Sequence, residues 1–340
     1  MVGAGSEPDS SPSSREKEAI TTLDSSNWRL STAPHPADTD WAEVLQSPPV
    51  RALAETLGAW ATGCQRLVLF LPAELSQLPW ESLPPSDQGT PALERGVTLS
   101  HWRNQRKGRE APVHRSLLAR DARMNDFNTL EAKLSARRHG IQHDSEPCAV
   151  DLLNGLRTPG DLHLIAHGQF EPGNPWHSEL TLHQDERALP AWTLPAAGVR
   201  GAVELSVCEA QRYGSDLGNR QWLGPVGIGP AAIAAGAQRV SGPLWACDIV
   251  ASLFFHARLF ELAKASPVRP LHETYAEARN WLRETPAGKL QAYYKKHIDP
   301  GQALRLDWHP QLAPRFKDAN TRPFDHPYYY AVFAILGDAG

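Results

Sequence analysis

Two short apolar segments constrain the fold of this chain most. Asp161-Leu-His-Leu-Ile-Ala-His167-Gly168 and Ala202-Val-Glu-Leu-Ser-Val-Cys208-Glu209 each read as a buried β-strand that ends in a reactive side chain. In an open α/β sheet, reacting groups lie just beyond the carboxyl ends of the strands. If the two strands are neighbours, they present the His167 imidazole and the Cys208 thiol to one crevice, which is the arrangement that a cysteine protease needs.

Predicted strands and helices alternate along the rest of the chain. Apolar runs predict strands at residues 66–71, 162–166, 199–207, 238–245 and 328–336, with a hairpin near 179–183. Helical spacing of apolar residues predicts helices from residue 41 to about 60 and at 125–138, 150–156, 226–237, 248–265 and 271–284. This alternation argues for an α/β layered sheet.

The division into domains follows from composition. Residues 1–40 are rich in Ser, Pro, Asp and Thr and are predicted to form a flexible tail or linker. Residues 41–340 are interpreted as one domain, with an N-terminal subregion at 41–140 and a catalytic subregion at 141–340. Residues 1–17 contain no apolar core of a signal peptide.

Charge and cysteine usage exclude several function classes. The formal charge is −4, from 34 basic and 38 acidic residues, so neither direct nucleic-acid binding nor membrane-surface binding is expected. The longest apolar candidate for a membrane span, residues 249–263, is interrupted by His256, Arg258 and Glu261. The four cysteines are widely spaced and form no CxxC pair, which favours a reducing cytoplasmic location.

The residues at the two strand ends suit thiol chemistry. A neighbouring His lowers the pKa of a thiol or accepts its proton during attack. A glycine at position 168 allows the backbone to approach closely, so that its N–H, with the N–H of Cys208, can donate to an oxyanion. The alternatives are a Cys that serves as a small buried apolar residue and a His that is merely a satisfied polar residue.

A zinc site is the alternative chemistry for these histidines. His163 and His167 are four residues apart, and His177 and His183 follow them. Four residues of a β-strand span about 13 Å, whereas two ligands of one zinc ion lie within about 4 Å of each other. His163 and His167 therefore cannot chelate together, and we do not expect a zinc site.

Six segments, in order, resemble the CHAT domain, a caspase-like and separase-like cysteine peptidase module. They span roughly residues 50 to 340 and are Phe70–Leu83, Leu162–Phe170, Trp176–Leu182, Leu205–Glu209, Gly236–Trp245 and His326–Asp338. The resemblance implies a caspase-like three-layer α/β fold, with a mostly parallel central sheet flanked by helices. It also implies peptide hydrolysis through a thioester, with His167 as general base or ion-pair partner, Cys208 as nucleophile, and Gly168 and Cys208 as oxyanion donors. Such a dyad needs neither a metal nor an organic cofactor.

The chain departs from the family pattern at two places. Ala210 stands where the family usually has Thr, and Asp248 lies three residues past Trp245, where the family and its separase relatives carry an Asp about four past. By resemblance, Asp248 faces the substrate pocket and favours a basic residue before the cut. Asp248 is also well placed as a helix N-cap. Trp245 is interpreted either as a pocket wall or as a core residue, and Cys247 as structural.

Two classes of function are compatible with these observations. The first is a regulated cysteine endopeptidase that cuts specific protein substrates in bacterial defence or cell death. By resemblance, its substrate is a gasdermin-like pore former or another defence effector, and its partner a separate sensor or activator protein. The alternative is a catalytically silent CHAT-fold module that acts as a scaffold for a partner protein. The presence of His167, Gly168 and Cys208 together favours the peptidase.

Overall fold

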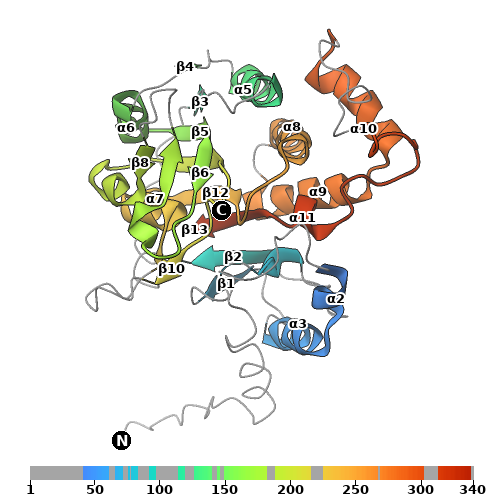
Figure 1. Ribbon diagram of the computed structural model, residues 1–340, viewed down its shortest axis with the longest axis horizontal. Coiled ribbons are helices and arrows are strands. Elements are labelled where there is room, and N and C mark those ends of the chain that lie inside the picture. Colours follow the sequence, from blue (N-terminus) through green and yellow to red (C-terminus); the bar gives the residue numbers. More distant parts are fainter. Residues whose placement is uncertain are drawn as a thin grey trace, which may run out of the picture.

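The computed structural model describes residues 41–60, 66–71, 76, 78–82, 92–96, 114–118, 126–139, 144–145, 149–181, 188–215, 225–266, 269–301 and 313–337. The predicted tail at residues 1–40 lies outside this part of the chain. Among the described residues, the dominant feature is an eight-stranded sheet in the order β1-β2-β13-β12-β9-β5-β3-β4 (Figure 1). The eight strands are, in that order, Arg66–Phe70, Ala92–Gly96, Phe333–Gly337, Arg239–Pro243, Ala202–Ser206, Asp161–Ile165, His114–Leu118 and Asp144–Ser145.

Neighbouring strands of this sheet are parallel except at one junction. Strands β12 and β13 pair antiparallel, and the remaining neighbours pair in parallel. Parallel strands need helical crossovers, which cover both faces of the sheet. The predicted α/β class with a mostly parallel central sheet is therefore confirmed.

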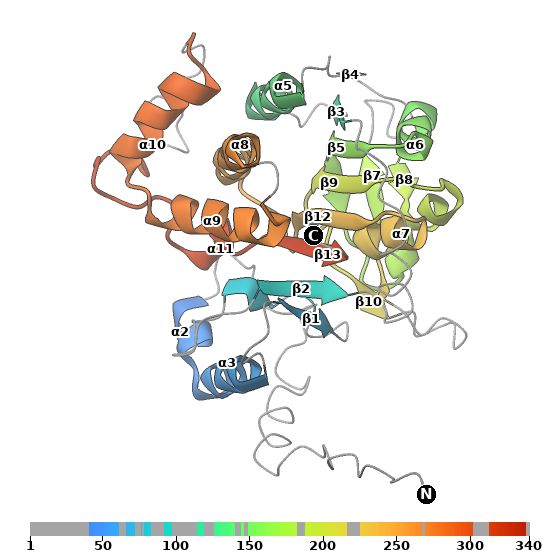
Figure 2. The same ribbon diagram turned by 180° about the vertical axis from the view of Figure 1, so that it is seen from behind.

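Helices form a layer on each side of the sheet (Figures 1 and 2). One face packs against α5 (Asp126–His139), α8 (Ile249–Ala265) and α9 (Leu271–Glu284). The opposite face packs against α6 (Ala149–Arg157) and α7 (Ile228–Ala234). Helices α2 (Trp41–Gln46) and α3 (Pro48–Trp60) lie beside the β1–β2 end of the sheet.

Smaller elements complete the described part of the fold. A three-stranded antiparallel sheet contains β6 (His167–Gln169), β7 (Glu179–Thr181) and β8 (Ala188–Pro190). Its strand β7 lies in the predicted hairpin region. The remaining small elements of the described residues are β10 (Gly214–Ser215), β11 (Pro225–Val226), α10 (Ala287–Tyr293), a π-helix (Tyr294–Ile298), α11 (Pro327–Tyr330) and 3-10 turns at Trp80–Ser82, Pro175–His177 and Ala191–Ala196.

Helix α8 is deeply buried over the first half of its length. Every residue from Val250 to Ala257 is buried, and such a run covers all sides of a helix. The helix therefore packs between the sheet and its neighbours α5 and α9 instead of showing one face to solvent. Helices that could cross a lipid bilayer are not found among the described residues, because none is both long and apolar enough.

The C-terminal segment differs from its prediction. Residues 328–336 were expected to form one strand, but the chain forms α11 first and enters β13 only at Phe333. Pro327 occupies the first helical turn, where proline is favoured, and the His326 Nδ1 accepts a hydrogen bond from the Tyr328 N–H at 3.2 Å. This local cap starts a helix where the apolar pattern alone favoured an extended chain.

Candidate active site

The register of β5 and β9 brings the two predicted reactive residues to neighbouring strand ends. Leu162 pairs with Val203 and Ile165 with Ser206, and the Ala166 N–H extends the ladder to the Ser206 carbonyl at 3.3 Å. The same sequence offset separates His167 from Cys208. The two predicted strands are thus parallel neighbours, and both candidate residues follow at their carboxyl ends.

After β5, the chain leaves the large sheet and enters β6. His167 pairs with Thr181 of β7, and Gly168 pairs with Leu180. A Cβ atom on Gly168 would lie 2.3 Å from the Val207 Cγ1 and 2.7 Å from the Cys208 carbonyl oxygen. Only a residue without a side chain allows β6 to cross the end of β9 this closely.

Cys208 begins a tight turn whose second residue is strained. Glu209 has a φ of 57°, in the left-handed region that non-glycine residues rarely adopt. Its N–H donates to the Trp245 carbonyl at 3.3 Å. Its carboxylate accepts hydrogen bonds from the Phe170 N–H at 3.0 Å and from the Arg212 guanidinium at 2.6 Å. Glu209 thereby joins the turn at Cys208 to the segment that follows His167, a role that the sequence did not reveal.

The Cys208 thiol is unusually acidic. A hydrogen bond from the Cys247 thiol is the main cause that lowers its pKa to about 7, assisted by the Cys247 N–H and opposed by burial. The pKa of Cys247 is raised well above its ordinary value by the same hydrogen bond, by burial and by the charges of Cys208 and Glu131. Near neutral pH, Cys208 is therefore substantially thiolate while Cys247 stays protonated. The interpretation of Cys247 as merely structural missed this contact.

The two predicted substrate-binding residues have partners within the protein. The Asp248 Oδ1 accepts from the Val250 and Ala251 N–H groups at 3.0 Å each, so Asp248 caps α8. Its Oδ2 accepts from the Arg315 guanidinium at 2.7 Å. Trp245 is 4% exposed in the core and donates from its indole N–H to the Tyr328 carbonyl at 3.2 Å. The structure matches the N-cap and core alternatives, and the pocket roles of both residues stay predictions.

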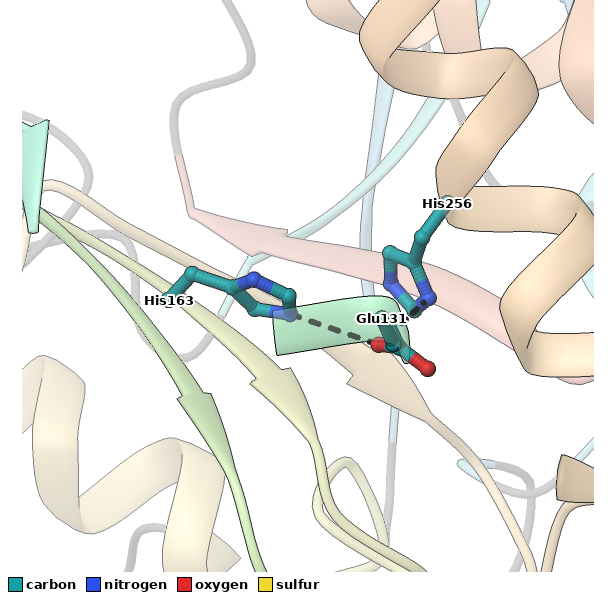
Figure 3. Close-up of side chains that lie close together, drawn as sticks. All are labelled: Glu131, His163 and His256. Carbon is teal, nitrogen blue, oxygen red and sulfur yellow. Dashed lines mark ion pairs between the residues drawn. The ribbon is translucent and has the colours of Figure 1, made fainter. Parts of the chain in front are cut away.

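A buried ionic cluster, Glu131, His163 and His256, lies beneath the strands that lead to the site (Figure 3). The Glu131 Oε1 of α5 is 3.4 Å from the His163 Nε2 of β5 and 3.1 Å from the His256 Nδ1 of α8. The Ser206 hydroxyl, two residues before Cys208, also donates to Glu131. The cluster therefore attaches both flanking helices to β5 and β9.

The cluster carries a charge pair in the protein interior. Burial alone would raise the pKa of Glu131, but the neighbouring His256 holds it well below its ordinary value. Burial opposes protonation of His256, but Glu131 and Glu204 raise its pKa. The Glu204 Oε1 lies 3.4 Å from the His256 Nε2. Opposite charges thus compensate each other where neither alone would be stable.

The ionic cluster is also the described group whose atoms are arranged most like metal ligands. One atom from each side chain lies within 4.8 Å of the other two. Ion pairs and hydrogen bonds from Ser206 and Ser252 already account for this arrangement. The spacing of the histidines pointed to His163 only together with His167, and the cluster was not predicted, although polar residues inside an apolar strand and an apolar helix were a signal for it.

Comparison with known families and structures identifies the architecture. The model of the CHAT domain matches residues 41–338. This chain belongs to the CHAT family. No curated protein matches the sequence of this CHAT chain.

Among solved structures, two gingipain structures share the caspase-like fold. The Arg-specific cysteine proteinase gingipain R (RGPB) aligns with a TM-score of 0.51 at 9% identity, over 88% of this chain and 69% of that chain. A complex of the Porphyromonas gingivalis RgpB pro- and mature domains aligns with a TM-score of 0.51 at 8% identity, over 88% and 71%. At these identities the similarity shows the fold alone.

The Saccharomyces cerevisiae separase–securin complex is a further structural relative. It aligns with a TM-score of 0.49 at 13% identity, over 79% of this chain. This chain spans only 15% of the length of that separase chain.

Proposed function

We propose that this CHAT chain is a cysteine endopeptidase in which Cys208 is the nucleophile and His167 is its general base. The observation that carries the proposal is the parallel register of β5 and β9, which delivers both residues to adjacent strand ends. A Cys208 pKa of about 7 adds support, because the thiolate is the form of cysteine that attacks carbonyl groups.

The proposed reaction proceeds in two halves. The Cys208 thiolate attacks the carbonyl carbon of the scissile peptide, and the protonated His167 then gives its proton to the departing amine. A thioester to Cys208 remains. His167 next removes a proton from water, which attacks the thioester and releases the acid product with regeneration of the thiol.

Backbone donors stabilise the tetrahedral intermediates of both halves. In the proposal, the N–H groups of Gly168 and Cys208 hydrogen bond to the oxygen that becomes negatively charged. Donors of this kind contribute about 3 kcal/mol each to the transition state, because they are fixed before the reaction begins. The tight crossing of Gly168 over the end of β9 supports this arrangement, since it brings both backbone segments together.

The proposal extends to a regulated enzyme with few protein substrates. By resemblance to its family, it acts in a bacterial defence or cell-death response, on a gasdermin-like pore former or another effector, under a separate sensor or activator protein. Four dispersed cysteines support a reducing cytoplasmic setting. A preference for a basic residue before the cut requires Asp248 to face the substrate while it also holds Arg315.

A library of peptides with a carbonyl electrophile at the C-terminus tests the proposal directly. We expect individual members to attach covalently to Cys208, with one label per chain, and to block cleavage of the matching peptide substrates. Peptide mapping by mass spectrometry identifies the labelled residue. Cleavage that persists after complete labelling of Cys208 contradicts the proposed nucleophile. Absence of both cleavage and Cys208 labelling supports the silent interaction module instead.

Gly168→Ala tests the backbone arrangement without touching either reacting side chain. The added methyl group meets the Val207 side chain and the Cys208 carbonyl at distances of 2.3 and 2.7 Å, so the backbone of β6 or of the nucleophile turn must shift. A displacement of about 1 Å in an active site commonly lowers the rate by about 10²-fold. We expect a decrease of that size in kcat/KM, measured on the best peptide substrate.

Gly173→Ala is the matched control for this substitution. Gly173 follows β6 a few residues after Gly168, but a Cβ atom at position 173 would meet only the flexible Glu171 carboxylate, at 3.2 Å. We expect this variant to keep a near-normal kcat/KM. Equal rates for the two variants would show that the crossing of Gly168 does not position the reacting groups.

A further inference from the structure

Cys208 and Cys247 are brought together by the strands that precede them. Strands β9 and β12 pair in parallel, and the turn after β9 is fastened to the segment that ends β12. The Glu209 N–H donates to the Trp245 carbonyl at 3.3 Å, and the Gln211 N–H donates to the Pro243 carbonyl at 2.9 Å. Cys247, two residues past Trp245, thereby lies beside Cys208, and its thiol and N–H lower the pKa of the Cys208 thiol. Neither cysteine is in a disulfide.

The two cysteines have complementary reactivity. The pKa values make Cys208 the thiolate and Cys247 the thiol near neutral pH. Both cysteines are partly exposed, and Cys247 also packs against the aromatic core around α8. Peroxides oxidise accessible thiolates first, and a neighbouring thiol then condenses with the sulfenic acid that forms. Cys208 suits the first role and Cys247 the second.

The chain around Cys247 permits the sulfurs to approach bonding distance. Residues 246 and 247 belong to neither a helix nor a strand, so a shift of this short connection breaks no strand pairing. The Cys208 turn is likewise outside β9. A disulfide requires an S–S separation of about 2.05 Å, and a movement of these two connecting segments brings the neighbouring thiols to it.

We propose that Cys208 and Cys247 form a reversible disulfide when the protein meets hydrogen peroxide, with Cys247 as the resolving cysteine. The Cys208 thiolate attacks one peroxide oxygen, giving the sulfenic acid and hydroxide. The Cys247 sulfur then attacks the Cys208 sulfur, the S–S bond forms, and the sulfenic hydroxyl leaves as water with the Cys247 proton. The two cysteines lose two electrons together, and the peroxide gains them.

This disulfide reversibly inactivates the proposed peptidase and protects the Cys208 sulfur from irreversible oxidation. The disulfide occupies the nucleophile, so no acyl-enzyme forms until a dithiol reductant restores Cys208. Without a resolving thiol, sulfenic acid is oxidised further to sulfinic acid, which ordinary reductants do not reverse. The effect on cleavage rests on the proposed function, whereas formation of the disulfide does not.

Oxidation of a Cys64→Ser/Cys148→Ser variant tests the pair, because Cys208 and Cys247 are then the only cysteines in the chain. After treatment with hydrogen peroxide, we expect loss of two hydrogen atoms from the intact mass and a cross-linked pair of proteolytic peptides. Dithiothreitol should restore both the mass and the full cleavage rate. Adding Cys247→Ala should instead give sulfinic acid on Cys208 and a loss of cleavage that dithiothreitol does not reverse.

The mass measurement separates this inference from the peptidase proposal. A disulfide in a chain that cleaves no peptide leaves the redox pair established and the enzyme rejected. A cleaving enzyme in which peroxide yields sulfinic acid on Cys208 without a cross-link to Cys247 overturns the inference. A disulfide between two chains, detected by a doubled mass, overturns it as well.

Discussion

Replacing Cys208 by Ala is expected to remove peptide cleavage, with kcat lowered by roughly 10⁴-fold or more. In the proposed mechanism, the Cys208 sulfur forms the covalent bond of the acyl-enzyme, and the alanine side chain has no atom that can substitute for it. His167→Ala should lower kcat by a similar order, because the leaving amine then lacks its proton donor. Both rates are measured on the best substrate from the peptide library.

The double variant provides the sharper measurement. Two residues that act as one unit give losses that do not add, so Cys208→Ala/His167→Ala should be no slower than Cys208→Ala alone. Losses that multiply instead would show that the two residues act independently and would contradict the dyad. Cys64→Ser is the matched control, since it removes a thiol outside the two paired strands and should retain the wild-type rate.

The central strands were predictable from sequence for a physical reason. Strands buried on both faces of a parallel sheet are nearly continuous apolar runs, and 162–166 and 199–207 have that composition. A reactive polar side chain follows each of these apolar runs, and for this reason His167 and Cys208 were candidate site residues. The observed strands, Asp161–Ile165 and Ala202–Ser206, are neighbours in the sheet.

The interactions that refine the site were not predictable, because they join distant parts of the chain. Ser206 donates to a carboxylate 75 residues earlier in the sequence, and the Phe170 N–H donates to a carboxylate 39 residues later. The left-handed conformation of Glu209 depends on a partner strand that local patterns do not specify. Sequence periodicity reports which side of an element is apolar, but it does not report which buried polar groups meet.

Glu131→Ala is expected to lower the free energy of unfolding by about 3–5 kcal/mol. The substitution removes the carboxylate that compensates a protonated His256 and accepts hydrogen bonds from Ser206 and Ser252. Each of those groups is buried and would be left without its acceptor. Urea-induced unfolding gives the measurement, and a loss of this size is a large fraction of the usual stability of a domain, about 5–15 kcal/mol.

The pH dependence of this effect has a defined sign. The lowered pKa of Glu131 stabilises the fold above the ordinary glutamate pKa of about 4.3, and this contribution is lost as pH falls through the lowered value. The raised pKa of His256 stabilises the fold below the ordinary histidine pKa of about 6.5, and this contribution is lost as pH rises through the raised value. The difference between wild type and Glu131→Ala should therefore be largest from about pH 4.3 to 6.5.

Glu273→Ala is the control that distinguishes the stability effect of a buried charge pair from that of a surface charge pair. Glu273 on α9 pairs with Arg269 at 3.2 Å, but its side chain is 49% exposed, so its loss should lower stability by less than about 1 kcal/mol. Equal losses for Glu131→Ala and Glu273→Ala would mean that no charge pair exists in the interior. If the difference is confirmed, the ionic cluster fastens α5 and α8 to the strands that end at His167 and Cys208. A destabilised cluster should then lower the cleavage rate even though none of its members touches the substrate.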